Sequence, residues 1–280
     1  LLFYLESFVR PRRFARIARR VGRSKPIVVV KSGRSEAGGR AAGSHTAALA
    51  GSDVAVDALF RQTGVLRAAT LEEMFGMARG LTTQPLPRGR SFGIVTNSGG
   101  PAILCADALE AAGLSVDRLP EATREELSSF LPDAASKQNP VDMIASAGPE
   151  AYRRAVETVL RCDGIDGLVV IYTPVGMFDT EAIATSVVDG VRAARAHGAE
   201  EKPVYASIVG GDEQRYSLRR IDEPDSLRVP VFTFPEEIGR VAGAAAGYAE
   251  WAASDSGAFP EYGDQRLDDA RDLCREALEE

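Results

Sequence analysis

The chain of 280 residues contains little histidine, tryptophan or cysteine, with two, one and three copies respectively. Its cysteines, Cys105, Cys162 and Cys274, are odd in number and far apart, which suggests neither a disulfide framework nor a zinc site and fits a reducing cytoplasm. No apolar run approaches the ~20 residues that a membrane-spanning helix needs. The first residues lack the basic flank of a signal peptide and an initiator methionine, so we expect the natural N-terminus to lie upstream.

The chain also lacks an excess of basic residues. Its formal net charge of −7 argues against a general nucleic-acid binder, which would need a basic surface for the phosphates. Arginines are nevertheless frequent between residues 10 and 23, and we interpret them as the solvated face of an amphipathic helix. The hydrophobic share of 45% is ordinary for a globular protein, and the length allows one large or two medium domains.

The first 83 residues alternate between strand and helix patterns, which predicts a parallel α/β sheet. Residues 1–5 read as a strand, Pro11 opens a helix, and 26–30 form a β-branched run typical of a strand buried on both faces. A loop of small residues follows from 32 to about 51. This unit (1–83) has too few strands for a complete doubly wound sheet, so we expect it to be incomplete at its N-terminus, with an exposed sheet edge that needs a partner.

A second α/β unit follows a proline- and glycine-containing boundary at residues 84–90. Strands are predicted at 92–96, 114–116, 167–172, 204–209 and 231–234, with helices between them. This pattern predicts a complete flavodoxin-like domain over 90–251. The polar residues 252–280 are expected to form a linker and a charged helix toward a further domain.

The two histidines have opposite surroundings. His197 lies near a predicted helix end before Gly198, where a structural or solvent role is favoured. His45 lies in a loop of small residues, Gly43 to Gly51, which would let an imidazole stand clear of the backbone and reach a partner. Spacing alone leaves both a functional and a structural role open for His45.

A glycine turn, residues 96–101, closes one buried strand and opens a helix. Its backbone N–H groups would lie at the positive end of the helix dipole, so the turn is either an anion site or simply a tight connection. It is neither a dinucleotide fingerprint nor a P-loop, because no lysine follows the glycines. The same two alternatives hold for residues 31–34. Asp142 could orient a ligand or cap the next turn.

Taken together, these stretches resemble the NDP-forming acyl-CoA synthetases, the superfamily that includes succinyl-CoA synthetase. The resemblance spans nearly the whole chain. It rests on the order and spacing of five segments, namely Tyr4-Leu5-Glu6, residues 26–34, residues 44–51, Asn97-Ser98-Gly99-Gly100 and Asn139-Pro140-Val141-Asp142. By resemblance, both units are CoA-ligase-type flavodoxin-like domains.

The resemblance implies a reversible reaction in which acyl-CoA, phosphate and ADP or GDP give a carboxylate, CoA and the nucleoside triphosphate. His45 would be the nucleophile that carries the phosphoryl group, and Glu6 would hold its other ring nitrogen, although Glu6 could also be an ordinary strand-end carboxylate. The helix that follows the glycine turn would stabilise phosphate. The implied phosphate-binding residues are Asn97, Ser98, Gly99 and Gly100, and Ser44 and Thr46 would support the histidine.

The implied cofactors are CoA, phosphate and ATP or ADP, with Mg²⁺ accompanying the nucleotide on an ATP-grasp domain outside this chain. The implied partners are an acyl-CoA or carboxylate substrate, CoA-binding and ATP-grasp domains or subunits, and an oligomeric assembly; no metal site, nucleic acid or membrane is expected. Ala47 replaces the usual glycine two residues after the histidine. Ala47 and the absent domains favour a rival function, a regulatory ligand-sensing module such as those fused to acetyltransferases, whereas the presence of His45 and Glu6 favours the enzyme; a scaffold for assembly is a third alternative. Because the CoA-binding and ATP-grasp modules are missing, we expect this chain alone to turn over little or nothing.

Overall fold

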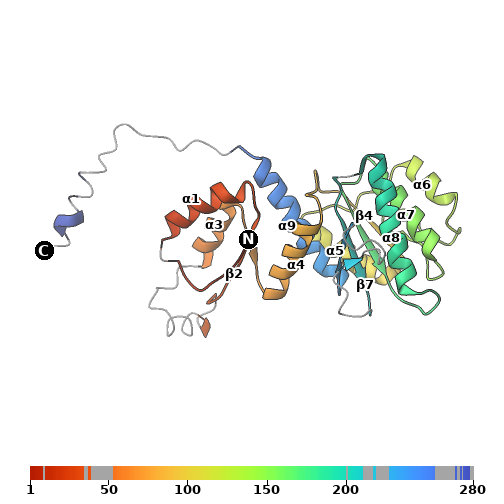
Figure 1. The fold of residues 1–280 in the computed structure, drawn as a ribbon, viewed down its shortest axis with the longest axis horizontal. Helices are drawn as coiled ribbons and strands as arrows, with labels where there is room; N and C mark the ends of the chain where they lie inside the picture. Colours follow the sequence, from red (N-terminus) through yellow and green to blue (C-terminus); the bar gives the residue numbers. More distant parts are fainter. Residues whose placement is uncertain are drawn as a thin grey trace.

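The computed structural model describes residues 1–8, 10–34, 37–38, 53–199, 201–210, 217–218, 227–255, 269, 272 and 274–277. The chain forms two sheets whose helices are stacked in layers, with one helical layer between the sheets (Figure 1). The prediction of two parallel-sheet α/β units is therefore confirmed. Most of the predicted linker and helix over 252–280 lies outside the described residues.

The first sheet has three parallel strands in the order β1-β2-β3. The strands are β1 (Leu2–Leu5), β2 (Ile27–Lys31) and β3 (Val65–Ala68). All five residues of β2 are buried, as its β-branched run predicts. Helices α1 (Pro11–Gly22) and α3 (Asp53–Thr63) pack on one face, where Phe60 meets Val29, and α4 (Leu71–Thr83) packs on the other.

The second sheet has six strands in the order β5-β4-β6-β7-β9-β8. They are β4 (Phe92–Thr96), β5 (Val141–Asp142), β6 (Gly167–Tyr172), β7 (Val204–Ile208), β8 (Ser217–Leu218) and β9 (Val229–Phe232). The first five strands in that order are parallel and follow the flavodoxin-like arrangement.

Two details of this sheet differ from the sequence prediction. Strand β8 is antiparallel to β9, because a strand at an open edge can pair in either direction. The prediction of a strand at 114–116 is wrong. Ser115 makes only an isolated bridge to Ser91, the residue that precedes β4 at the margin of the sheet. Short strands such as β5 and β8 carry too little periodic signal to be recognised.

Helices cover both faces of the second sheet (Figure 1). Those between the sheets are α4, α5 (Gly99–Ala111) and α9 (Pro235–Ala253). On the far side lie α6 (Glu121–Ser128), α7 (Pro149–Arg161) and α8 (Thr180–Ala194), which runs into a π-helical turn η1 (Arg195–Ala199). A single core joins Val28 and Met77 of the first unit to Phe232 and Val241 of the second. A Cβ added at Gly239 would stand 2.5 Å from the carbonyl oxygen of Ala108, so α9 approaches α5 as closely as a glycine permits.

The C-terminal end of α9 packs against the first unit. Tyr248 donates a hydrogen bond of 2.7 Å to the carbonyl of Gly22, at the end of α1. The ring of Trp251 lies against Gly22 and Gly64, and the Arg23 guanidinium carbon is 4.6 Å from the ring centroid. The two sheets are therefore joined by a packed seam as well as by the connecting chain.

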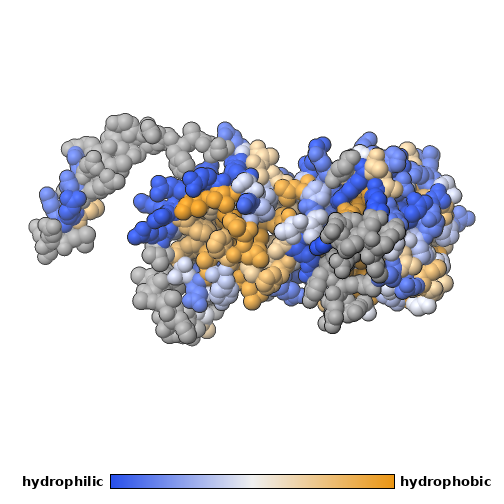
Figure 2. Space-filling view, viewed as in Figure 1, coloured by the Kyte–Doolittle hydropathy of each residue, from blue (hydrophilic) through white to orange (hydrophobic). Residues whose placement is uncertain are grey.

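Apolar side chains gather on the surface of the first unit (Figure 2). Leu2, Phe3 and Tyr4 of β1 are 41%, 39% and 57% exposed, and within the described part of the chain β1 pairs only with β2. The exposed sheet edge expected from the sequence is thus present. The arginines of α1 at positions 12, 13, 16 and 20 are exposed, as a solvated helix face requires. No helix among the described residues has the length and apolarity to cross a membrane.

The seam predicts a large penalty for Gly64→Ala. Gly64 has φ +68°, and an added Cβ would stand 2.2 Å from ring atoms of Trp251. We expect the free energy of unfolding to fall by about 2–4 kcal/mol, from strain and overlap together. The measurement is urea unfolding followed by fluorescence of the single tryptophan. Gly176→Ala is the matched control, since φ is +76° and nothing lies within 4 Å; it should cost only about 1 kcal/mol. Equal losses in the two variants would show that Trp251 does not pack on Gly64.

Candidate functional site

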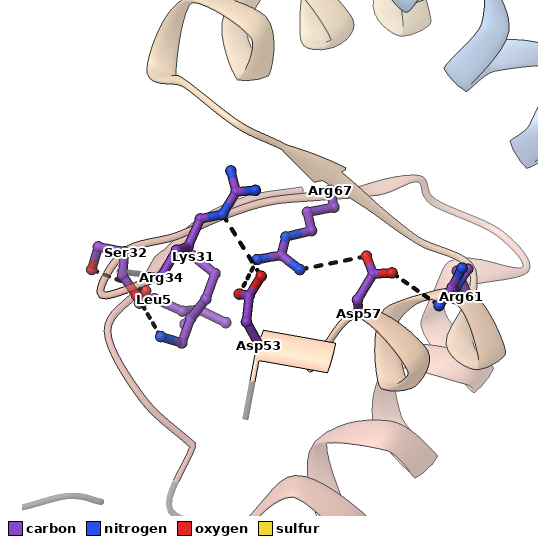
Figure 3. Close-up of polar contacts among 8 residues, drawn as sticks. All are labelled: Leu5, Lys31, Ser32, Arg34, Asp53, Asp57, Arg61 and Arg67. Carbon is purple, nitrogen blue, oxygen red and sulfur yellow. Dashed lines mark hydrogen bonds and ion pairs between the residues drawn. The ribbon is translucent and has the colours of Figure 1, made fainter. Parts of the chain in front are cut away.

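Polar side chains gather at the carboxyl ends of the strands of the first sheet (Figure 3). Because β1, β2 and β3 are parallel, their carboxyl ends meet at one edge, where Glu6, Lys31 and Arg67 lie. The N–H of Ser32 donates to the carbonyl of Leu5 at 2.9 Å and holds the ends of β1 and β2 in register. His45, Ser44 and Thr46 lie outside the described residues, so their predicted roles stay predictions.

Lys31 places a buried cation at this edge. The residue is 5% exposed, and its ammonium donates to the carbonyl of Ser32. Burial lowers the pKa of Lys31. The carboxylate of Asp53 opposes this effect by raising the pKa, Arg67 lowers the pKa further, and Glu6 raises it to a lesser degree. Glu6, half-buried just beyond β1, therefore lies within electrostatic reach of Lys31. From the sequence, residues 31–34 could form either an anion site or simply a tight connection.

An ion cluster fixes the start of α3 against β3. The guanidinium of Arg67, whose side chain is 15% exposed, contacts Asp53 and lies 3.4 Å from Asp57. Arg61 pairs with Asp57 at 3.0 Å, and Arg34 Nε lies 3.9 Å from the other oxygen of Asp53. Arg34 follows β2 and Asp53 begins α3, so this cluster joins the end of β2 to the start of α3.

The second sheet offers a different site, at the point where its strand order reverses. From β4 the chain passes to β5 on one side and then to β6 on the other, and ligands of open α/β sheets bind outside the carboxyl ends of strands at such a point. Asn97 and Thr173 follow β4 and β6 there. The Asn97 amide donates to the carbonyl of Thr173 at 2.9 Å and accepts from its N–H at 2.9 Å. With Asn97 only 3% exposed, its side chain is committed to joining the strands.

The N-terminus of α5 opens at this same point. Thr96 Oγ1 accepts from the N–H of Ser98 at 3.0 Å, and the side chain of Ser98 makes no capping hydrogen bond. The first N–H groups of a helix have no intrahelical partner, so those of Gly99 and Gly100 are available to an anion beside the positive end of the helix dipole. Gly100 is exposed, and a Cβ added there would meet nothing within 4 Å.

Asp142, at the end of β5, borders this helix terminus. One carboxylate oxygen accepts the N–H of Ile144 at 3.0 Å, the turn-capping alternative open from the sequence. The other oxygen would stand 3.0 Å from a Cβ added at Gly99, so the carboxylate faces α5 as well. Ile144 has φ +62°, which is uncommon for a β-branched residue and places a strained turn next to the helix terminus.

The structure brings the predicted residues together in two groups. Asn97, Ser98, Gly99 and Gly100 form one turn, whereas Glu6 belongs to the edge of the other sheet. Their phosphate-binding and histidine-holding roles stay predictions. Sequence reasoning missed Thr173, Asp53 and Arg67 as members of these groups. All three flank predicted strand or helix ends, but only the strand order and the packing of α3 on β3 show that they are neighbours.

A cavity of about 640 Å³ lies elsewhere, beside the amino ends of β6 and β7. It is lined by charged residues of both signs, including Arg88, Asp166, His197 and Lys202. His197 Nδ1 lies 2.8 Å from the carbonyl of Ala193 in the preceding helical turn, so its hydrogen bond is a local one at the helix end. Among the residues that the structure covers, no group of three or more acidic, histidine or cysteine side chains could hold a metal ion.

Cys105 lies in the middle of α5, on the face packed into the core. It is fully buried, and burial raises the pKa of its thiol to about 12. Cys162 is buried too, whereas Cys274 is exposed. The thiol nearest to the helix terminus is therefore kept protonated.

Two protein families match this chain, and the boundary between their matches coincides with the boundary between the two sheets. Residues 1–81 match the succinyl-CoA ligase like flavodoxin domain, and residues 92–257 match the Ligase-CoA domain. The alpha subunit of acetate–CoA ligase [ADP-forming] II from Pyrococcus furiosus is 40% identical over 86% of this chain and 52% of its own length. The 4-hydroxybutyrate–CoA ligase [ADP-forming] of Nitrosopumilus maritimus is 30% identical over 94% of this chain and 36% of its own length.

A solved structure has the same fold. It is the dinucleotide forming acetyl-coenzyme A synthetase 1 of Candidatus Korarchaeum cryptofilum in complex with phosphate and ADP, with a TM-score of 0.80 and 31% sequence identity. The match covers 90% of this chain and 53% of that one. The chain thus spans about half the length of the Pyrococcus furiosus subunit and of this solved structure, and about a third of the length of the 4-hydroxybutyrate ligase.

The hydrogen bonds of Asn97 predict a structural cost that its neighbour does not share. Asn97→Ala leaves the partly buried N–H and carbonyl of Thr173 without the partners that the Asn97 side chain supplies, so the free energy of unfolding should fall by about 2–4 kcal/mol. Ser98→Ala, which removes no capping bond, should change it by less than about 0.5 kcal/mol. Urea unfolding of both variants is the measurement. Similar values for the two would show that Asn97 does not join β4 to β6.

Proposed function

Since this chain belongs to the Ligase-CoA domain family, with a succinyl-CoA ligase like flavodoxin domain ahead of it, we propose that it is the histidine-bearing part of an NDP-forming acyl-CoA synthetase. The complete enzyme would interconvert acyl-CoA, phosphate and ADP with a carboxylate, CoA and ATP. The choice of ADP is supported by the names of the relatives, which are ADP-forming ligases. Relatives that use acetate and 4-hydroxybutyrate support a short acyl group.

The observation that carries this proposal is the open N-terminus of α5 at the strand-order reversal of the second sheet. An anionic oxygen of phosphate attacks the thioester carbonyl, the carbon–sulfur bond breaks, and CoA leaves as the thiolate with the bonding electrons. The N–H groups of Gly99 and Gly100 and the helix dipole stabilise the negative charge on the phosphate and on the acyl phosphate that forms. Asp142 borders this site and limits the space beside Gly99.

The second step transfers the phosphoryl group to His45. The unprotonated nitrogen of a neutral imidazole attacks phosphorus, the bond from phosphorus to the acyl oxygen breaks, and the carboxylate leaves with the electron pair. The other ring nitrogen keeps its proton. Glu6 accepts that N–H, holds the ring in the reactive tautomer and stabilises the positive charge of the phosphorylated imidazole. Lys31, a buried cation, lies within electrostatic reach of Glu6.

The final step returns the phosphoryl group from His45 to ADP. We assign the nucleotide with its Mg²⁺, and the CoA, to an ATP-grasp domain and a CoA-binding domain or their subunits outside this sequence. We place the assembly in the reducing cytoplasm, as an oligomer. Because the similar ligases are catalytic, the enzyme is favoured over the regulatory module that the sequence left open.

The test uses the two histidines as a matched pair in the complete enzyme, assembled with its other domains or subunits. After incubation with acetyl phosphate, or with ATP and Mg²⁺, the intact mass of this chain is measured at alkaline pH. We expect a phosphate adduct that acid removes. His45→Ala should abolish the adduct and lower turnover at least about 10³-fold, because it removes the nucleophile that accepts the phosphoryl group in this mechanism.

His197→Ala is the control. Its ring bonds only to the preceding helical turn, so the adduct and turnover should be unchanged. No adduct on the wild-type enzyme, or an adduct that persists in His45→Ala, would contradict the proposal and favour the ligand-sensing module.

A further inference from the structure

We propose that Asp142 is a specificity-determining residue, whose carboxylate accepts the hydrogen of protonated phosphate at the start of α5 and thereby discriminates phosphate from sulfate. This inference rests on the proposed function, which assigns phosphate to the N–H groups of Gly99 and Gly100. The feature that carries it is a fixed carboxylate oxygen that faces the first turn of α5.

The sheet directs the side chain of Asp142 toward the start of α5. Asp142 of β5 pairs with Thr96 of β4, and side chains at paired positions of parallel strands lie on the same face of a sheet. Thr96 Oγ1 accepts the N–H of Ser98, in the turn that leads into α5. The carboxylate of Asp142 therefore lies on the same side of the sheet as that turn.

Three hydrogen bonds hold Asp142 in this position. Its carbonyl accepts the N–H of Ser136 at 2.8 Å, and the following residue, Met143, donates its N–H to the carbonyl of Thr96 at 2.8 Å. The carboxylate oxygen Oδ1 accepts the N–H of Ile144 at 3.0 Å. Because the backbone and one carboxylate oxygen are both held, a ligand meets the other oxygen in a preorganised position.

That other oxygen, Oδ2, makes no hydrogen bond within the described part of the chain. It would stand 3.0 Å from a Cβ added at Gly99, and a Cβ lies about 1.5 Å from its Cα, so Oδ2 lies within about 4.5 Å of the Gly99 Cα. Capping of the turn at Ile144 uses Oδ1 alone and leaves the position of Oδ2 unexplained. An anion bound by the first N–H groups of α5 would meet this oxygen.

A carboxylate beside an anion site repels an anion unless the anion brings a proton of its own. Near neutral pH inorganic phosphate keeps at least one proton, whereas sulfate, which is also tetrahedral, keeps none. The hydroxyl of phosphate can donate to Oδ2, and a hydrogen bond from a hydroxyl to a carboxylate is short and strong. Sulfate would meet the same oxygen with like charge alone. One carboxylate oxygen therefore attracts phosphate and rejects sulfate.

The same oxygen distinguishes phosphate from the acyl phosphate that forms from it. When phosphate attacks the thioester, the phosphate releases its proton and the thiolate of CoA takes up one proton, so atoms and charge balance. Near neutral pH the acyl phosphate has no proton left to donate, and Oδ2 repels it. Asp142 therefore favours the binding of phosphate and the transfer of the phosphoryl group away from α5.

Asp142→Asn tests this role because the two side chains have the same shape. The amide oxygen can still accept the N–H of Ile144, while the NH₂ group replaces Oδ2 and turns an acceptor into a donor. In the complete enzyme, the initial rate of CoA release from acetyl-CoA is measured across phosphate concentrations, with sulfate as the competitor at constant ionic strength. We expect the KM for phosphate to rise about tenfold or more and the inhibition constant of sulfate to fall about tenfold or more.

Asp107→Asn is the matched control. Asp107 is exposed on the same helix, about 12 Å beyond Gly99 along the axis, so both constants should stay within about twofold of the wild type. A second readout is the half-saturating concentration of acetyl phosphate for phosphorylation of His45. It should not rise in Asp142→Asn, because acetyl phosphate loses no hydrogen bond to Oδ2.

Unchanged constants in Asp142→Asn would overturn the role of Asp142 alone. A parallel weakening of phosphate and sulfate would also overturn it, because a displaced site weakens both anions. The wild-type enzyme supplies a check that needs no variant: sulfate binding as tight as phosphate binding would contradict the inference. A wild-type enzyme that releases no CoA in response to phosphate would overturn the proposed function, and with it the role of Asp142.

Discussion

Both sheets of this chain depend on one layer of helices that lies between them. Helix α4 closes the open face of the first sheet and packs on α9, and α9 in turn lies against α5 at a separation that only a glycine at position 239 permits. The shared core formed there includes residues of both units. Because α5 belongs to this layer, its N-terminus is held by the same contacts that hold the first unit in place.

The parallel direction of the strands explains where the polar groups lie. Strands buried on both faces leave no room for charged side chains along their length, so these side chains collect where the strands end. In the first sheet they form an ion cluster that joins the ends of β2 and β3 to the start of α3, and in the second they frame the start of α5. The proposed phosphoryl carrier suits this division, with its anion site assigned to the second unit and its nucleophile to the first.

The fold could be predicted from the sequence because the signals for its strands and turns are local. The β-branched run of β2 and the glycine turn at 96–101 are readable from neighbouring residues, and both lie where they were predicted. It failed for β8, whose direction depends on an edge far away in the chain, and for the expected strand at 114–116. Both polar atoms of the Asn97 side chain bond Thr173, a partner 76 positions away that only the strand order reveals. The phosphate-binding role of Asn97 stays a prediction. The roles of His45 and Glu6 stay predictions, because they follow from family resemblance rather than from described contacts.

The burial of Cys105 has a consequence for selectivity. Thioesters are attacked by thiolates, and an enzyme that binds acyl-CoA next to a reactive cysteine would divert acyl groups onto itself. Cys105 lies on α5, the helix that the proposed function assigns to phosphate, and its pKa of about 12 leaves almost none of it ionised near neutral pH. Its burial also keeps bulky thiols such as CoA from reaching the sulfur. In the proposed enzyme, the core packing of α5 would therefore prevent transfer of the acyl group to this cysteine.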